Sequence, residues 1–449
     1  MAELPVLFTE YTRQLMGEER FERYLQSFEE DTPVSIRLNP LKCSDVRGNC
    51  EEGAIGELCD GGERLEVRDG EQVPWCQNGY YLKQRPNFTF DPLFHAGCYY
   101  VQEAASMFLD EVLRQIFREK VTVNSEKFPT GQENAEANYS LFSIHYNLNC
   151  LDMCAAPGGK STLLRAALPE DCVLYSNEPV RNRASILLEN VEKWGYKNHF
   201  VTNAYPKDYR KSKSRFDIIL CDVPCSGEGM FRKDPATISE WNPQNVEKCW
   251  QLQREIVSDA WSCLNDGGLF IYSTCTYNTK ENEENIRWML SEFDDAEVVP
   301  IDTKPEWNIT GSLLEGFTEP VYRFIPGITR SEGLFMCVLR KGGLSPVPSL
   351  GREGRKMRQA VPPVISPLST QRGVGGESVN LTYQQAIAYL RGEALVLPDG
   401  TPRGVVDVTF MGHTLGPVKN IGSRANNLYP KPWRIKTTHI PNEYVPVLK

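Results

Sequence analysis

Two cysteines near the middle of the chain each lie just after a short apolar run. Cys225 lies in Asp222-Val-Pro-Cys-Ser-Gly, and Cys275 lies in Ser273-Thr-Cys-Thr. Strands that end in reactive side chains are how an open α/β sheet forms an active site, because ligands bind at the carboxyl ends of the strands. A thiolate can add covalently to an electron-poor ring. The pattern predicts two neighbouring thiols in one crevice, with Asp222 facing the same crevice.

A glycine loop, Cys154-Ala-Ala-Pro-Gly-Gly-Lys160, precedes both thiols. Glycines after a first strand let the backbone approach a ligand, and the next helix offers free N–H groups to an anionic group. Glu178 stands about twenty residues later, where an acid can bind ribose hydroxyls. The loop also ends like a phosphate-binding loop, but Cys154 replaces the first glycine of that motif. A nucleotide-like cofactor is therefore favoured over a nucleoside triphosphate.

The composition is that of a soluble globular protein with two to four domains, since 449 residues are 41% hydrophobic and 24% charged. No apolar run approaches the roughly 20 residues of a membrane helix, and the first residues lack a secretory pattern. None of the 14 cysteines forms a Cys-x-x-Cys pair. We expect a cytoplasmic protein with reduced thiols, no metal and no membrane contact.

Charge is unevenly distributed along the chain. The net charge is −10, yet residues 351–449 hold 13 Lys and Arg against 6 Asp and Glu. This asymmetry predicts an anion-binding C-terminal module on an acidic body. A solvated surface with a chance gradient is the alternative interpretation.

Hydrophobic periodicity divides the chain into regions. An amphipathic helix is expected at 8–30 and a strand at 35–39, and the turn-rich stretch 43–92 reads as a small α/β unit. A helix at 101–117 and a polar surface insertion at 121–147 follow.

From about residue 150 to 340, strands and helices alternate, which is typical of a doubly wound, mostly parallel sheet. Strands are expected at 150–153, 172–176, 199–202, 216–221 and 268–273, with helices at 161–167, 183–193 and 246–264. Residues 342–372 read as a linker or lid. Residues 373–449 contain one helix, 383–391, and then short runs typical of a small β-barrel.

Taken together, these motifs resemble those of the RNA cytosine-5 methyltransferases that use S-adenosylmethionine. The lead-in Asp91-Pro-Leu-Phe-His-Ala-Gly97 fits the same family, and Leu415–Lys419 with Asn426–Lys431 resembles the PUA-type RNA-binding module of its bacterial RsmF branch. The resemblance covers nearly the whole chain outside 121–147 and 342–372. It implies a Rossmann-like class I methyltransferase domain at 93–341, a small N-terminal α/β domain at 1–92 and a PUA-like β-barrel at 373–449.

The resemblance also implies roles for individual residues. Cys275 would be the nucleophile, Cys225 would help to release the product, and Asp222 would serve both catalysis and cofactor binding. Asn203 stands where the family usually has Asp, and Val223 replaces the usual Ala. The cofactor S-adenosyl-L-methionine would be contacted by Cys154, Ala155, Ala156, Pro157, Gly158, Gly159, Lys160, Glu178, Arg183, Asn203 and Asp222.

This chemistry suits the residues. Cytosine C5 is a poor nucleophile, so a thiolate must first add to C6, and the C5 proton and the thiol must later leave with acid–base help. Asp222 can bond the N3 and amino edge that distinguishes cytosine from uracil. Because the base must be unstacked to react, looped or opened RNA is the expected substrate.

Two other functions remain open at the level of sequence. A DNA cytosine-5 methyltransferase attacks with the cysteine of its Pro-Cys motif and would leave Cys275 without a role. A non-catalytic RNA-binding or ribosome-assembly factor would need neither thiol. The expected partner is RNA, with small-subunit ribosomal RNA ahead of transfer RNA. No DNA partner is expected, and a monomer is expected.

The C-terminal module offers a specific expectation. Basic residues lie beside two aromatic residues, Tyr429 and Trp433, so phosphates would be neutralised while the rings stack on unpaired bases. Alternatively, the two rings fill the core of the small barrel. The basic residues are Lys419, Arg424, Lys431, Arg434 and Lys436.

Overall fold

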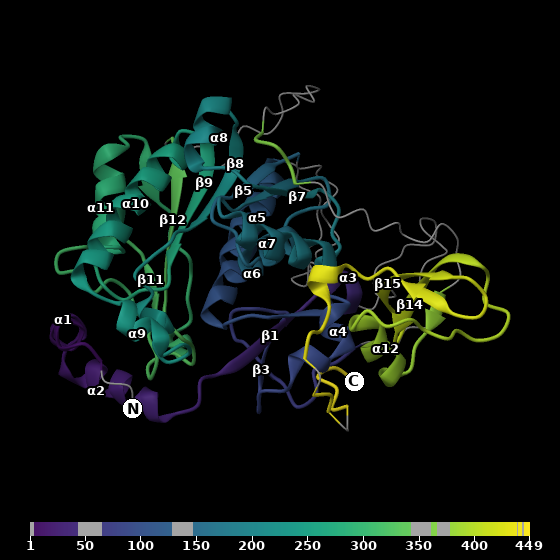
Figure 1. The fold of residues 1–449 in the computed structure, drawn as a ribbon. Coiled ribbons are helices and arrows are strands. Elements are labelled where there is room, and N and C mark those ends of the chain that lie inside the picture. Colours follow the sequence, from purple (N-terminus) through teal and green to yellow (C-terminus); the bar gives the residue numbers. More distant parts are fainter. Residues whose placement is uncertain are drawn as a thin grey trace.

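Three β-sheets organise the chain in this computed structural model (Figure 1). It describes residues 4–43, 65–127, 147–342, 361–365 and 378–449, except 438, 442 and 443. The central sheet, formed by residues 149–341, is the largest. A four-stranded N-terminal sheet lies between it and the C-terminal module (Figure 1).

The chain begins with α1 (Val6–Met16), α2 (Glu18–Gln26) and the 3-10 turn η1 (Ser27–Glu29). One helix over 8–30 was predicted, and this is wrong because Gly17 adopts φ +76° and separates two helices. Phe8 and Tyr24 on the apolar faces pack against Phe231, Trp241 and Tyr277 of the central region. Both helices therefore lie against the central region and not against the N-terminal sheet (Figure 1).

The N-terminal sheet has the order β2-β3-β1-β4 and is antiparallel throughout. Its last strand extends the sheet beyond the predicted boundary at residue 92. The predicted helix from residue 101 starts later, because Val101 is still paired with Ile36. The elements are β1 (Val34–Leu38), α3 (Pro40–Cys43), β2 (Glu71–Gln72), β3 (Gly79–Leu82), η3 (Phe88–Phe90), α4 (Pro92–His95), β4 (Tyr99–Val101), η4 (Ala105–Met107) and α5 (Phe108–Lys127).

Helix α5 continues into the stretch 121–147 that was predicted to be a surface insertion. The rest of that prediction, 128–146, lies outside the described residues.

The central sheet has the order β10-β12-β9-β8-β5-β6-β7, with β11 paired to β12. Strands β5 to β9 are parallel and β12 is antiparallel to β9, which confirms the predicted doubly wound fold. The strands are β5 (Asn149–Asp152), β6 (Val173–Asn177), β7 (His199–Thr202), β8 (Phe216–Asp222), β9 (Leu264–Thr274), β10 (Ala296–Val298), β11 (Tyr322–Phe324) and β12 (Leu334–Lys341).

Alternate residues of these strands enter separate cores on the two faces of the sheet. Ile218 and Ile271 belong to one apolar cluster, whereas Ile219 and Phe270 belong to the other. Burial on both faces explains why the strands read as nearly continuous apolar runs. The flanking elements are α6 (Gly159–Ala167), α7 (Arg181–Trp194), α8 (Pro206–Ser212), η6 (Glu228–Met230), α9 (Ala236–Glu240), α10 (Pro243–Trp261), α11 (Glu283–Glu292) and η7 (Pro305–Trp307).

Strand order reverses between β5 and β8, because the chain leaves β5 for β6 on one side and later returns to β8 on the other. In open α/β sheets, ligands bind at the carboxyl ends of the strands at such a switch point. The glycine loop follows β5 and the first cysteine motif follows β8. The topology therefore brings both motifs to one crevice.

The C-terminal module has a sheet of order β13-β14-β15-β16 and one helix, whose start is closed by a capping box between Thr382 and Gln385. Leu390 and Val418 of this module share one apolar core with Ile36 and Leu93 of the N-terminal region. Its elements are β13 (Ser378–Asn380), α12 (Tyr383–Leu390), β14 (Gly404–Phe410), β15 (His413–Asn420), β16 (Ala425–Asn427) and η8 (Lys431–Trp433).

Part of the predicted linker 342–372 is ordered against the central sheet. The Ile365 N–H donates to the Val201 carbonyl oxygen at 2.8 Å, and Val364 forms a β-bridge with Thr202. Residues 361–365 therefore cover the free edge of β7, while the rest of the predicted linker lies outside the described residues.

Within the described ranges, no helix combines the length and apolar character needed to cross a membrane.

Candidate active site

The two motif cysteines lie side by side. Strands β8 and β9 are parallel neighbours, with Asp222 in register with Ser273. The Sγ atoms of Cys225 and Cys275 are 3.1 Å apart, and the Cys275 N–H donates to Cys225 Sγ at 3.3 Å. The predicted crevice with two adjacent thiols is therefore present in the fold.

An ion pair lies beside the thiols. Lys160 Nζ is 2.9 Å from Asp222 Oδ2, and the Asp222 side chain is 32% exposed. Burial lowers the pKa of Lys160, but Asp222 and, more weakly, Cys275 raise it, and the net shift is upward. Lys160 therefore remains a cation in the crevice that holds the two thiols.

The two thiols are not equivalent. The contact with Cys275, followed by burial, raises the pKa of Cys225 well above its ordinary value. Cys225 is therefore held as a neutral thiol next to the sulfur of Cys275. As a neutral thiol, Cys225 can supply a proton beside Cys275.

Buried carboxylates hold the two cysteine loops together. Glu228 accepts from the N–H groups of Tyr277 and Asn278 at 2.7 and 2.9 Å. Glu281 accepts from the Ser226 N–H at 3.0 Å and from Gln253 Nε2 at 2.6 Å. The sequence interpretation missed both acids, because nothing in their local sequence distinguishes them from solvated carboxylates.

Backbone contacts fix the same loops from behind. The Gly229 N–H donates to the Cys275 carbonyl oxygen at 2.8 Å. A Cβ atom at Gly229 would lie 2.7 Å from the Cα atom of Gly333. Only glycines permit this approach, so the second glycine of Ser226-Gly-Glu-Gly229 allows the loop to pack against the backbone of Cys275.

The glycine loop turns sharply from β5 into α6. Gly158 precedes α6 with φ +118°, a conformation that favours glycine. The loop carbonyls are held by side chains of α7, because Arg183 Nη2 donates to the Ala156 oxygen and Asn190 Nδ2 donates to the Pro157 oxygen. Of the remaining predicted cofactor residues in the loop, Cys154 is half-buried, Ala155 is buried and Gly159 opens α6.

Polar groups suited to a nucleoside lie at the ends of β6 and β7. The Glu178 side chain is 2% exposed, and its Oε2 is 3.3 Å from Arg183 Nη1. Asn203 Nδ2 donates to the carbonyl oxygens of Glu178 and Pro179 at 2.6 and 2.9 Å. The predicted residues at these strand ends are thus brought together with the glycine loop.

The end of β5 carries a carboxylate that the sequence interpretation missed. Asp152 Oδ2 accepts from Ser161 Oγ at 2.5 Å, whereas its Oδ1 is buried without a partner among the described residues. Burial raises its pKa to about 7. An amino group at this crevice would satisfy the unpaired oxygen, so the residues fit an amino-acid-bearing nucleoside such as S-adenosylmethionine.

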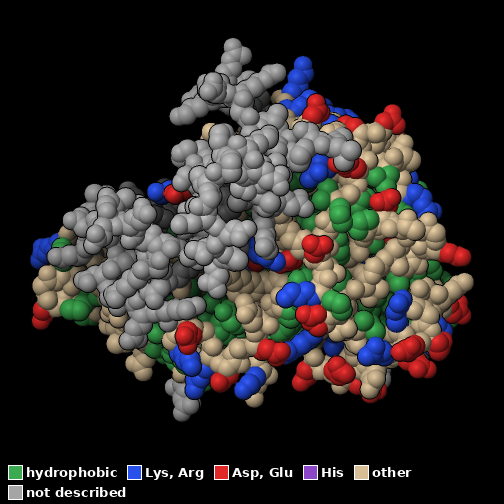
Figure 2. All heavy atoms as spheres, turned by 180° about the vertical axis from the view of Figure 1, so that it is seen from behind, with side chains coloured by type: hydrophobic (Ala, Val, Ile, Leu, Met, Phe, Trp, Pro, Cys, Tyr) green, Lys and Arg blue, Asp and Glu red, His purple; other side chains and the backbone are tan. Residues whose placement is uncertain are grey.

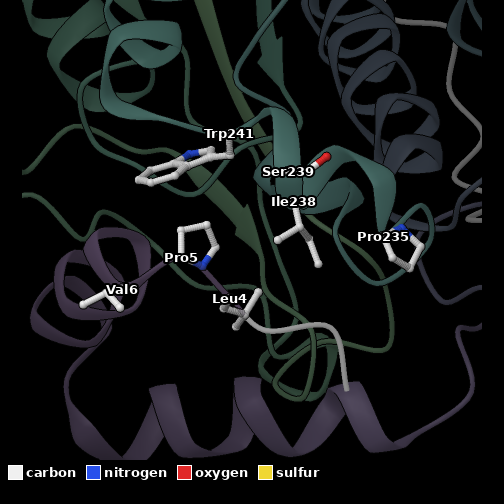
Figure 3. Close-up of a pocket in the computed structure, with 7 residues that line it drawn as sticks. All are labelled: Leu4, Pro5, Val6, Pro235, Ile238, Ser239 and Trp241. Carbon is white, nitrogen blue, oxygen red and sulfur yellow. The ribbon is translucent and has the colours of Figure 1, made fainter.

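Two further observations concern metal binding and a second pocket. Within the described chain, no group of three or more His, Cys, Asp and Glu side chains is arranged to hold a metal. An apolar pocket of about 510 Å³ lies between the start of α1 and α9 and contains none of the reactive groups (Figure 3). Its lining residues are Leu4, Pro5, Val6, Pro235, Ile238, Ser239 and Trp241.

The expectation of two aromatic platforms on the C-terminal module is wrong for Tyr429, which is 3% exposed and belongs to the core. Trp433 is half-buried, with Lys193 Nζ 5.6 Å from its ring centre. Arg434 donates to the Tyr429 carbonyl oxygen. The other four predicted basic residues, Lys419, Arg424, Lys431 and Lys436, are exposed.

Three family models match successive parts of the chain. Residues 141–340 match the 16S rRNA methyltransferase RsmB/F, residues 4–104 match the N-terminal domain of 16S rRNA methyltransferase RsmF, and residues 377–435 match the RsmF PUA domain. The boundaries of the matches fall near the three sheets of the structure.

Individual relatives agree with these models. The ribosomal RNA small subunit methyltransferase F of Pectobacterium atrosepticum is 31% identical over 369 residues, which cover 79% of this chain and 66% of that protein. The protein of the same name from Escherichia coli O6:H1 is 28% identical, covering 80% and 84%. The chain thus spans just under two thirds of the length of the first of these relatives.

Solved structures show the same fold. A methyltransferase homolog protein from Pyrococcus horikoshii has a TM-score of 0.55 at 26% identity, covering 75% of this chain and 94% of that one. NSun6 from the same organism has a TM-score of 0.54 at 18% identity, covering 76% and 98%. The resemblance inferred from the motifs is confirmed: this chain belongs to the RsmB/F family of 16S rRNA methyltransferases, with RsmF-type N-terminal and PUA domains.

Proposed function

We propose that this chain transfers a methyl group from S-adenosyl-L-methionine to C5 of a cytidine in small-subunit ribosomal RNA. The observation that carries the proposal is the pair of thiols 3.1 Å apart, beside Lys160 and Asp222, at the switch point of the sheet. Membership of the RsmB/F family supports ribosomal RNA as the substrate.

The cofactor supplies a methyl group on a positively charged sulfur. Glu178 would accept from the ribose hydroxyls, the backbone at Gly158 would lie against the cofactor, and Asp152 Oδ1 would accept from the amino group. Asn203 would present its side-chain oxygen to the adenine edge, because its Nδ2 is already engaged. Lys160 and Asp222 would separate this part of the crevice from the thiols.

The reaction of the base follows from the side chains. The Cys275 thiolate adds to cytosine C6, and the electron pair moved to C5 forms the bond to the methyl carbon while the bond from that carbon to the donor sulfur breaks and a neutral thioether leaves. Asp222 accepts a hydrogen bond from the amino group of the ring, and it donates to N3 when it carries a proton. A base then takes the C5 proton, and the Sγ–C6 bond breaks. Cys225 donates a proton to the departing sulfur.

The test compares two cysteine variants with a third cysteine as control. Cys275→Ala should lose methyl transfer by at least about a thousandfold and form no covalent RNA adduct. Cys225→Ala should still attack but fail to release, so a denaturant-stable protein–RNA complex should accumulate. Cys249→Ala, which removes a half-buried thiol of α10 and leaves both motif cysteines in place, should behave like the wild type. The assay is tritium transfer from labelled S-adenosylmethionine, with gel analysis of the adduct.

The opposite pattern, with capture by Cys275→Ala and none by Cys225→Ala, would favour attack from the Pro-Cys cysteine. Bisulfite mapping of RNA from cells lacking the protein would then identify the cytidine. If the cells lack a 5-methylcytidine in transfer RNA and keep all those of small-subunit ribosomal RNA, transfer RNA replaces ribosomal RNA as the proposed substrate. Unchanged marks together with retained RNA binding would favour a non-catalytic factor.

A further inference from the structure

A polar cleft of about 240 Å³ lies between the N-terminal segment and the loop that follows β11. Arg232 forms part of its wall, and Glu30 and Asp31 are exposed at it. The cleft also has apolar surface from Pro33 and Ile328. The remaining lining residues are Gly327, Thr329, Arg330 and Ser331.

Two polar side chains of this cleft are buried and incompletely bonded. The Arg232 side chain is 5% exposed and lies 2.9 Å from Glu332 Oε1, but its Nε has no partner among the described residues. Ser331 is 2% exposed, and its hydroxyl likewise lacks a partner in the described chain. Buried polar groups are normally satisfied, so a ligand or an ordered water must complete them.

The cleft is built on the loops that hold the nucleophile. Arg232 follows Gly229, whose N–H donates to the Cys275 carbonyl oxygen. On the other side, the Glu332 N–H donates to Glu103 Oε1 at 2.9 Å, and Ser106 N–H donates to Glu103 Oε2 at 3.1 Å. Ser106 is in turn the neighbour of Lys160. A strand of RNA with its target base at Cys275 would therefore pass close to this cleft.

The charges of the cleft select the kind of group that fits. The carboxylates of Glu30 and Asp31 offset the two arginines of the cleft, Arg232 and Arg330, so the cleft has no excess positive charge for a phosphate. A guanine offers O6 and N7 as acceptors to an arginine, and its N1–H and N2–H groups are donors for a carboxylate. Unpaired bases of RNA are commonly bound through these edges and through contacts on their faces. Arg232, Ser331 and Asp31 supply the donors and acceptors, while Pro33 supplies apolar surface.

We propose that this cleft binds an unpaired guanine in the RNA strand that carries the target cytidine. The inference rests on the proposed function, since it names a second contact of the same substrate. Guanine binding would hold the strand in register, so that one cytidine among several is presented to Cys275.

The test uses the full chain and RNA in which each guanine near the mapped cytidine is replaced by adenosine. Ser331→Ala, which removes only a hydroxyl, should raise KM for RNA about threefold to tenfold and leave kcat nearly unchanged. Arg232→Lys should raise KM by about tenfold or more. Arg20→Gln, an exposed arginine of α2 outside the cleft, is the matched control and should leave KM unchanged.

Replacement of one particular guanine should raise the KM of the wild type as much as Arg232→Lys does. The same replacement should not raise the KM of the Arg232→Lys variant any further. Direct binding of guanosine monophosphate, measured by NMR against the adenosine, cytidine and uridine monophosphates, gives a readout that does not depend on methyl transfer. The wild type should bind guanosine monophosphate most tightly of the four nucleotides. The Ser331→Ala variant should lack this preference.

A wild type that methylates RNA but shows no guanine dependence and no preference among the nucleotides would overturn the cleft proposal, leaving an ordered water as its occupant. A wild type that methylates no RNA but prefers guanosine monophosphate would retain the cleft and reject the proposed function.

Discussion

At the scale of single residues, the position of Cys275, the proposed nucleophile, depends on a contact between two glycines. Gly229 and Gly333 approach so closely that a Cβ atom at Gly229 would also lie 2.8 Å from the Cys275 carbonyl oxygen. Backbone atoms cannot yield as a flexible side chain can. The loop after β8 and the start of β12 are therefore held at a fixed distance from each other, next to the backbone of Cys275.

Gly229→Ala should lower the free energy of unfolding by about 1–3 kcal/mol through overpacking and lower kcat more than cofactor affinity. Gly311→Ala is the control, because a Cβ atom at Gly311 meets nothing within 4 Å. Denaturant unfolding and single-turnover methyl transfer give the two readouts. Equal behaviour of the two variants would show that the contact relaxes without consequence.

Asp152 predicts a pH dependence of stability. Burial raises its pKa from 3.8 to about 7, so the folded chain keeps this proton at pH values where the unfolded chain has lost it. The stabilisation is full below about pH 4 and is lost as pH rises towards 7. Asp152→Asn should flatten the slope of unfolding free energy against pH by up to about 1.4 kcal/mol per pH unit in that window.

The slope is measured by denaturant unfolding at pH 5, 6, 7 and 8. Asp294→Asn, at an exposed carboxyl, should leave the slope as in the wild type. A variant Asp152→Asn with the wild-type slope would mean that Asp152 titrates normally in the folded chain.

At the scale of elements, α1 and α2 contact the segment that follows Cys275 from outside the central sheet. The Thr279 N–H donates to the Tyr11 hydroxyl at 3.1 Å, and the rings of Tyr24 and Tyr277 meet edge to face at 5.4 Å. These contacts join the start of the chain to the segment directly after Cys275. The first helices therefore belong to the active site in space, although more than 250 residues separate them from it in sequence.

Tyr11→Phe removes the hydroxyl and keeps the ring, so it should cost about 0.5–1.5 kcal/mol of stability. Because the affected loop carries Cys275, kcat should fall severalfold while the affinity for S-adenosylmethionine stays unchanged. Tyr205→Phe, at an exposed tyrosine before α8, is the matched control. Calorimetric cofactor binding and steady-state rates separate the effects, and a changed cofactor affinity with normal kcat would contradict the expectation.

At the scale of the whole molecule, the C-terminal module is part of a shared core. Glu66 and Lys449 exchange backbone hydrogen bonds, both at 2.9 Å, and the Tyr444 hydroxyl donates to Asp91 Oδ1 at 3.1 Å. Deleting residues 373–449 would expose buried apolar surface of the N-terminal sheet, so it would not test RNA binding alone. On the visible part of the face in Figure 2, Lys and Arg side chains are interspersed with Asp and Glu.

RNA binding by the module is better tested with point changes. Replacing Lys419, Arg424 and Lys436 by Gln should lower the slope of log affinity against log salt by about 0.7 for each residue that contacts a phosphate of unpaired RNA. Cofactor affinity should not change. The control replaces Lys211, Lys248 and Lys304, which are exposed outside the module. Equal slopes for the two triple variants would show that the module does not supply specific phosphate contacts.

The sequence by itself determined the strands of the central sheet and the places of the motifs that follow them. Apolar runs such as 216–221 and 268–273 must be buried on both faces, and glycine loops and polar residues end them, so both strand positions and motif residues could be read locally. The family resemblance rested on the same local signals. The bend at Gly17 was missed because a glycine is tolerated within a helical pattern and only its conformation shows the break.

Tertiary structure alone decided how distant segments support the site. Whether Tyr429 stacks on RNA or fills a core depends on which surface packs over it, and the same aromatic side chain suits both. Likewise, Glu228 and Glu281 look like solvated acids until the fold supplies backbone N–H groups around them. Periodicity records the side of an element that is buried, whereas the identity of the partner is set by long-range packing.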